Sequence, residues 1–213
     1  MKKLSRQDLY DILVGCTILG TGGGGSLEKG LDLVDKAIQA GKEFVLAGLD
    51  EVPDHAMVGV PYMCGAVSPE TEEQEMKYRG LPRIGEEPAL KALEEMEGYL
   101  GEKFYGVIST ELGGGNTAVA FYVAAMLGKK IIDADPAGRS VPELQHSTFY
   151  INQLPIYPVA VANDFGDVVI VKEVVNDERA EALVRAMAVV SDNSVGVVDH
   201  PARMGDIKNA VIP

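Results

Sequence analysis

Apolar residues recur at helical spacing in five segments of the chain. In the first, Ser5 and Asp8 form a capping box, and apolar residues follow at positions 9, 12, 13 and 16. Ser26 can cap the second, which stops at Gly41. The predicted helices span residues 5–19, 26–41, 86–101, 116–128 and 177–193.

Short apolar runs rich in β-branched residues predict strands between these helices. They span residues 43–49, 56–67, 104–110, 129–135, 155–162, 167–174 and 194–200. The order strand, glycine-rich loop, helix, strand over residues 104–135 is a βαβ unit, whose strands should be parallel. The sequence "NDFGD" predicts a hairpin turn. We therefore expect an α/β fold with a mixed, partly parallel sheet flanked by helices.

Charge and cysteine content narrow the class of protein. The formal charge of -13 would repel phosphate backbones, which argues against a nucleic-acid partner. Part of the acidic excess lies in residues 68–80 and 85–103, which are typical of solvated helix faces. The two cysteines lack disulfide or zinc spacing, and no segment is typical of a signal peptide or a membrane span. These features predict a cytoplasmic protein with no membrane association.

Two runs of glycine each precede a predicted helix, at residues 22–25 and 113–115. Such loops can offer free backbone N–H groups to an anion or oxyanion, whereas the structural alternative is a hinge or a helix cap. We expect both runs to converge on one cleft, because each permits close approach of a backbone. The predicted substrate-binding residues here are Thr21, Gly22, Gly23, Gly24, Gly113, Gly114, Gly115 and Asn116.

The densest polar cluster follows the predicted strand 129–135, in the sequence "DADPAGRSVPELQHS". Asp135 stands at the switch to a loop, and Arg139 can pair with it or hold a substrate carboxylate. Glu143 and His146 share a face if residues 142–147 form a helical turn. We predict catalytic roles for Asp135, Glu143 and His146 and substrate binding for Arg139. The alternative is a structural network of ion pairs.

Other candidate groups are interpreted as structural. Cys16 and Cys64 lie in apolar settings and are expected in the core. His55 is expected at the surface, and so is His200 in its Asp-His-Pro sequence, with a role as a ligand as the alternative. No metal ligand is predicted and no cofactor is required, although a carboxylate and histidine cluster also suits a hard divalent metal.

A dinucleotide site is a further alternative. Gly113, Gly115 and Ala118 fit a G-x-G-x-x-A pattern after a strand, and Asp133 follows about twenty residues on. The dinucleotide fingerprint normally begins a domain, however, whereas several helices and strands are predicted ahead of this unit. We therefore rank a dinucleotide-dependent oxidoreductase third, below the two functions described next.

Three stretches together resemble the S-methyl thiohydantoin desulfurase family. They read "ILGTGGGGS", "ELGGGNTAVAFYVAAMLGKKIIDADPAGRSVPELQ" and "PVAVANDFGDVVIV". The family is often encoded beside hydantoinase/oxoprolinase-type proteins. The resemblance implies an α/β N-terminal domain followed by a mainly β C-terminal domain. We expect residues 1–213 to be the former alone, since the chain finishes on the apolar "KNAVIP" where a relative would continue.

The resemblance also implies an activity, the hydrolysis of an S-methyl thiohydantoin to a hydantoin with loss of methanethiol. A glycine loop can stabilise the developing negative charge, and a carboxylate or His146 can activate the water. The expected partner is then a small-molecule substrate. The sequence leaves open whether the chain forms a homo-oligomer. The alternative is a non-catalytic binding or assembly domain of a hydantoinase-like system.

We predict that the chain does not bind a dinucleotide. The polar partners around Asp133 and the charge of -13 both work against a polyanionic ligand. A thermal-shift titration with oxidised and reduced nicotinamide cofactors should therefore show no saturable change. A binder present at about a hundred times its dissociation constant would stabilise the fold by roughly 2.7 kcal/mol. A shift of that kind would favour the oxidoreductase reading.

Overall fold

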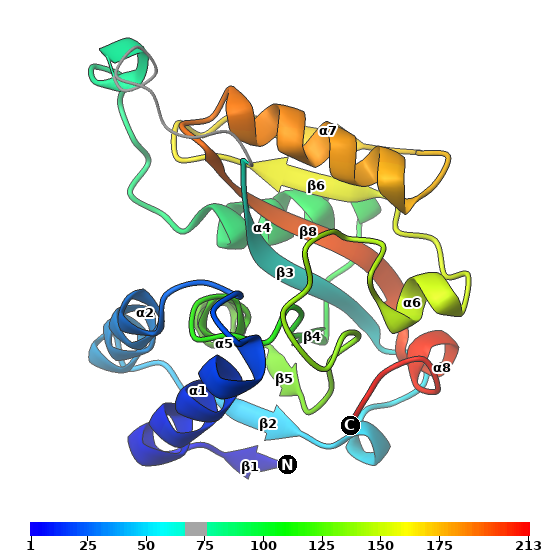
Figure 1. The fold of residues 1–213 in the computed structure, drawn as a ribbon. Coiled ribbons are helices and arrows are strands. Elements are labelled where there is room, and N and C mark those ends of the chain that lie inside the picture. Colours follow the sequence, from blue (N-terminus) through cyan, green and yellow to red (C-terminus); the bar gives the residue numbers. More distant parts are fainter. Residues whose placement is uncertain (67–75) are drawn as a thin grey trace.

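The computed structural model describes residues 1–66 and 76–213 and contains one eight-stranded sheet with the order β1-β2-β5-β4-β3-β8-β6-β7 (Figure 1). The strands are β1 (Lys2–Lys3), β2 (Val45–Ala47), β3 (Met57–Gly65), β4 (Gly106–Ile108), β5 (Lys130–Ile132), β6 (Val159–Ala162), β7 (Val168–Val171) and β8 (Ser194–Arg203). Residues 67–75 lie outside the described part, and with them most of the acidic segment 68–80 and the last residue of the strand predicted over 56–67.

The sheet is mixed, as predicted. Strands β2, β5, β4 and β3 run parallel to one another, and β4, α5 and β5 form the expected βαβ unit. Strand β8 pairs antiparallel with β3 and with β6, and β6 and β7 form the predicted hairpin. Parallel strands bring their carboxyl ends to one edge, where open α/β sheets bind ligands.

All five predicted helices form, with small shifts at their ends. Ser5 makes the capping box with Asp8, and the Ser26 side chain caps the second helix. The helices are α1 (Arg6–Gly20), α2 (Leu27–Gln39), α4 (Pro88–Leu100), α5 (Asn116–Leu127), α6 (Thr148–Ile151), α7 (Asp177–Val189) and α8 (Met204–Ile207), with a 3-10 turn at Leu49–Glu51. In the described part of the chain, no helix is long and apolar enough to cross a membrane.

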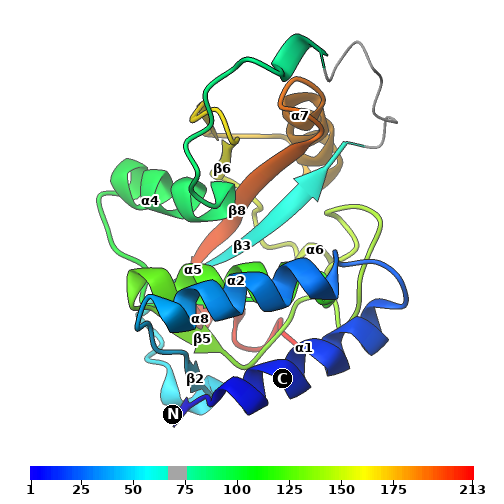
Figure 2. The same cartoon turned by 90° about the vertical axis from the view of Figure 1, so that its left-hand side faces the viewer.

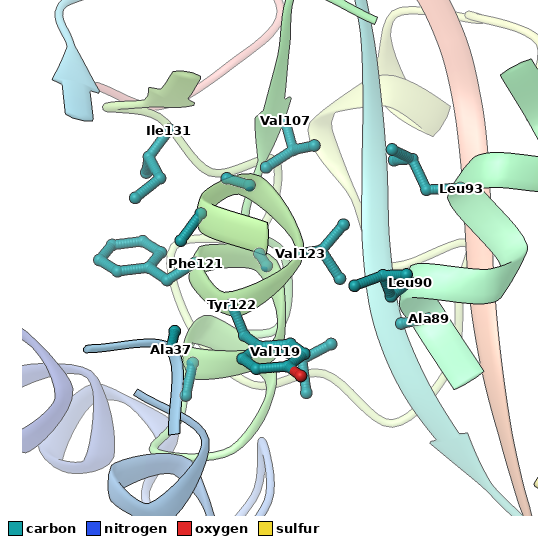
Figure 3. Close-up of a cluster of buried hydrophobic side chains, with 14 of the residues drawn as sticks. Ala37, Ala89, Leu90, Leu93, Val107, Val119, Phe121, Tyr122, Val123 and Ile131 are labelled. Carbon is teal, nitrogen blue, oxygen red and sulfur yellow. The ribbon is translucent and has the colours of Figure 1, made fainter. Parts of the chain in front are cut away.

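Helix α5 lies at the centre of one core. Ten of its twelve residues are buried, so it lacks the polar stripe of a surface helix. Figure 3 shows Phe121 beside Ile131 on one side of α5 and Val123 beside Leu90 of α4 on the other. Helices α1, α2 and α4 complete this layer.

A second core covers the opposite face of the sheet. Phe149 of α6 and Val184 of α7 pack there with inward side chains of the central strands, including Tyr62 and Val197. Figure 2 shows α4 and α7 on opposite sides of β8, which separates the two layers. The hydrophobic face of each layer is thereby buried against the shared sheet.

Contact between glycines fixes the distance between α2 and α5. A Cβ atom on Gly30, within α2, would lie 1.9 Å from the carbonyl oxygen of Gly114. A Cβ on Gly114 would in turn lie 2.4 Å from Cα of Leu27. These distances are well below a van der Waals contact, so the two helices can approach this closely only through glycine.

Two alanine substitutions in helix interiors should have opposite effects. Gly30→Ala should destabilise the fold, because the new methyl group meets the backbone of Gly114. Gly15→Ala in α1 meets nothing within 4 Å and should stabilise it by up to about 1 kcal/mol through helix propensity. Chemical denaturation of both variants measures this difference. Equal stabilisation of both would contradict the proposed role of Gly30.

Candidate active site

The two glycine runs meet, as the sequence predicts. The carbonyl oxygen of Gly24 accepts hydrogen bonds from the N–H groups of Gly115 at 3.0 Å and Asn116 at 2.9 Å. A Cβ on Gly113 would lie 2.5 Å from Cα of Gly24. The glycines at these positions are therefore explained by backbone-to-backbone packing.

This packing changes the expected role of the second run. The N–H groups of Gly115 and Asn116 are used within the protein, and that of Gly113 donates to Oγ1 of Thr117 at 3.4 Å. Gly113 and Gly114 are buried. The Gly24 carbonyl also occupies the N-terminus of α5, where a dinucleotide fold would place the pyrophosphate. An oxyanion site formed by the Gly115 and Asn116 amides does not fit this geometry.

A cleft of about 460 Å³ opens beside the place where the glycine runs meet. It lies at the carboxyl end of β3, and its walls come from the α1–α2 loop, the segment after β4, the loop 140–144 and α7. The lining residues are Gly20, Thr21, Gly23, Gly24, Tyr62, Met63, Cys64, Gly65, Glu111, Ser140, Val141, Pro142, Leu144 and Arg185. Of the predicted substrate-binding residues, Thr21, Gly23 and Gly24 are among them.

Glu111 is the carboxyl group that lines this cleft, and its pKa lies near neutrality. Burial raises the pKa of its carboxyl group to about 7, partly opposed by the hydrogen bond from Asn116 and by the charge of Arg185. A carboxyl group with a pKa near neutrality is suited to general acid–base catalysis. Its backbone has φ +52°, a left-handed conformation that is uncommon outside glycine and recurs at functional sites.

Asn116 holds Glu111 in place. Its Nδ2 donates to Oε2 of Glu111 at 2.9 Å, and its Oδ1 accepts the N–H of Met63 at 3.0 Å. Asn116 therefore connects the start of α5, the end of β3 and the carboxylate after β4. It does not line the cleft, so its placement supports a positioning role in place of the predicted contact with substrate.

Arg185 supplies the positive charge of the cleft. Its Nε donates to Oε1 of Glu181 at 2.6 Å, its Nη2 donates to the Pro142 carbonyl at 3.1 Å, and its Nη1 donates to the Gly65 carbonyl. One side chain of α7 thus fixes the loop 140–144 against the end of β3.

Cys64 lines the cleft but is a poor nucleophile. Burial raises the pKa of its thiol to about 12, so the thiolate is scarce at neutral pH. Both cysteines are buried and free, as expected of core residues.

Asp135 lies in a different pocket from Glu111. Its Oδ1 accepts the N–H groups of Ala137, at 2.6 Å, and Gly138, and burial raises its pKa to about 6. It lines a cavity of about 290 Å³ with Ser109 and Cys16. The described residues give it no ion pair, so the predicted pair with Arg139 does not form in this structure.

The other predicted catalytic residues stay at the surface. Glu143 and His146 are exposed, and the segment between them forms a single turn closed by a 3.1 Å hydrogen bond from the His146 N–H to the Glu143 carbonyl. Arg139 is also exposed, and its Nε donates to the Ser140 carbonyl at 3.2 Å. None of the three lines the cleft, and neither do Gly22, Gly113, Gly114 and Gly115.

His200 is buried, which corrects the expectation of a surface residue. Only 4% of it is exposed, and its Nδ1 lies 2.9 Å from Oδ1 of Asp199. The hydroxyl of Tyr62 donates to the other oxygen of Asp199 at 2.7 Å. The three side chains form a buried polar chain behind the cleft.

Sequence patterns single out neither Glu111 nor Arg185. The available signal for Glu111 was its place directly after a buried parallel strand, where ligand-binding groups gather. Arg185 lies on an amphipathic helix and carries no local signal. Within residues 1–66 and 76–213, no three His, Cys, Asp or Glu side chains come close enough to hold a metal ion.

Comparisons with known proteins agree with the fold. Residues 7–173 match the family model described as S-Me-THD-like, N-terminal domain. The structure is similar to a crystal structure of a protein from Chromobacterium violaceum, with a TM-score of 0.77 and 21% sequence identity. That match covers 99% of this chain but 57% of the other, and at such low identity it shows the fold alone. No curated protein matches the chain significantly.

Glu111→Gln should stabilise the fold at neutral and alkaline pH. The folded state raises the pKa of Glu111 from 4.5 to about 7, so ionising it costs stability between these values, and the cost is complete above pH 7. At roughly 1.4 kcal/mol per unit the gain from glutamine is up to about 3 kcal/mol above pH 7 and vanishes towards pH 4.5. Thermal unfolding of both proteins across this pH range measures it. A variant less stable than the parent at alkaline pH would contradict the assignment.

Proposed function

Because this chain belongs to the S-Me-THD-like family through its N-terminal domain model, we propose that it hydrolyses a small five-membered S-methyl thiohydantoin ring in the cleft beside Glu111. The observation that carries the proposal is the Glu111 carboxyl group, which lines the cleft, is fixed by Asn116 and has a pKa of about 7. The cleft volume of about 460 Å³ suits a small ligand.

Glu111 acts as the general base in this reaction. Its carboxylate removes a proton from a water molecule, whose oxygen bonds to the ring carbon that carries sulfur. The carbon–sulfur bond then breaks, and the proton held by Glu111 passes to the departing methanethiolate. The second water proton ends on the ring nitrogen, which leaves a hydantoin carbonyl. Water and substrate are thus converted to hydantoin and methanethiol with no other reactant.

The remaining polar groups of the cleft orient the ring and balance its charge. Arg185 is held by Glu181 and by two carbonyls, so its position is fixed before substrate enters. Thr21 also lines the cleft, and its hydroxyl can donate to or accept from a ring amide. Cys64 remains a thiol and contributes to the wall.

Methanethiol release from an S-methyl thiohydantoin tests the proposal. The purified chain should release it with a rate that rises as pH passes through about 7, because the base must be ionised. Glu111→Gln should lower kcat by on the order of a hundredfold or more, the usual contribution of a general base.

Glu143→Gln is the matched control, because Glu143 is an exposed carboxylate outside the cleft. This variant should keep the parent activity. Equal activity of the Glu111 variant and the parent would refute the role of Glu111. Ring binding without release of methanethiol at any pH would instead favour the non-catalytic binding domain.

A further inference from the structure

A second, much smaller cavity lies directly behind the cleft. Its volume is about 20 Å³, enough for one water molecule. It shares Tyr62, Glu111, Val141 and Leu144 with the cleft lining. The full lining is Val60, Tyr62, Thr110, Glu111, Pro136, Val141, Leu144, Ser147, Phe149, Asp199 and His200. Glu111 therefore borders both spaces.

His200 brings an unpaired polar atom to this region. Its Nε2 is buried and has no hydrogen-bond partner among the described residues. Leaving a buried polar atom unpaired costs roughly 1–3 kcal/mol, so such atoms generally have a partner, often an ordered water. With Nδ1–H directed at Asp199, a neutral imidazole presents Nε2 as an acceptor.

The His200 ring is held from several sides. Its backbone N–H donates to the Ile156 carbonyl at 3.0 Å, and its φ of +43° is in the left-handed region. The ring lies against Phe149 with centroids 4.7 Å apart. Asp199 fixes Nδ1 and is itself held by the Tyr62 hydroxyl. Such fixed geometry is typical of a group that orients another.

We propose that one water molecule in the small cavity links Nε2 of His200 to the carboxylate of Glu111, so that Tyr62, Asp199 and His200 position the general base. The water donates one hydrogen to Nε2 and the other to Glu111. The link between this water molecule and the Glu111 carboxylate does not depend on what the protein catalyses. The effect of the water on turnover, in contrast, rests on the proposed function. The three residues are positioning residues, because they act on Glu111 through the water molecule and not on the substrate.

The link predicts the direction of a measurable shift. A water that donates to the Glu111 carboxylate favours the ionised form, so its loss should raise the pH at which Glu111 titrates. The other groups that act on Glu111 are Asn116, Arg185, Glu181 and Asp135. The titratable groups close to His200 are Asp199, Tyr62 and the buried Asp177 of α7. The test must leave all of these in place.

Carbon-13 NMR of the glutamate side-chain carboxyl groups measures the titration without requiring turnover. Glu111→Gln identifies the signal by its disappearance. His200→Asn should raise the titration midpoint by at least about half a pH unit, because asparagine tolerates the left-handed backbone but is too short to reach the water. His55→Asn, the same change at an exposed histidine, should leave the midpoint unchanged.

Tyr62→Phe is the second variant. It removes one hydroxyl, retains the ring in the core, and should shift the Glu111 midpoint in the same direction by a smaller amount. In the parent protein, the nitrogen-15 signal of His200 Nε2 should change as Glu111 titrates, and this change should be lost in Glu111→Gln. The link is refuted by a folded His200→Asn protein with the parent midpoint, or by an Nε2 signal that responds identically with Glu111 or Gln.

Kinetics separate failure of the link from failure of the proposed function. If both hold, the rising limb of kcat for methanethiol release should move upward in pH with the NMR midpoint in His200→Asn. Shifted NMR midpoints with no turnover by the parent would refute the hydrolase and leave the link intact. Turnover that depends on Glu111, with an unchanged Glu111 midpoint in both His200→Asn and Tyr62→Phe, would refute the link and leave the hydrolase intact.

Discussion

The hydrogen bonds from Gly115 and Asn116 to the Gly24 carbonyl are the contact on which the candidate site depends. They fix the start of α5 against the α1–α2 loop, and they fix the backbone of Asn116. The Asn116 side chain then reaches both Met63 in β3 and the Glu111 carboxylate. A main-chain contact between two loops thereby determines the position of a titratable group. This contact requires glycine at several positions, since a Cβ on Gly24 would lie 2.7 Å from Cα of Gly113.

The charged groups around Glu111 act on its ionisation in opposite directions. The chain carries a formal charge of -13, and Glu181 and Asp135 both disfavour ionisation of Glu111. Arg185 opposes them from the cleft wall. The protein therefore keeps a carboxyl group in a place where ionisation is costly, which is a stability cost commonly found at functional sites.

The sequence predicts the elements well because their signals are local. Helical periodicity, the Ser5 capping box and the βαβ order each depend on neighbouring residues, and all appear in the structure. The short helices α6 and α8 were not predicted, because four residues carry too little periodicity.

Prediction of the site was weaker, for physical reasons. A glycine run that receives a ligand and one that receives another backbone have the same composition, so convergence was predictable but its purpose was not. Glu111 acquires its chemistry from burial, which depends on segments far along the chain. His200 is hidden in an Asp-His-Pro sequence typical of surfaces, yet it packs against Phe149. Glu143 and His146 had suitable chemistry but no tertiary contact that turns them inward.

The packing of the α1–α2 loop on the second glycine run has a consequence for how this cleft can diversify. Gly24 lines the cleft, and a Cβ there would lie 2.7 Å from Cα of Gly113, so this wall cannot be reshaped by a larger side chain at Gly24. The loop 140–144 carries larger side chains into the cleft, and it is held by hydrogen bonds from Arg185 to the Pro142 carbonyl and from the Leu144 N–H to Glu181. A change in the shape of the cleft is therefore easier to make through the side chains of residues 140–144 than through the glycine wall.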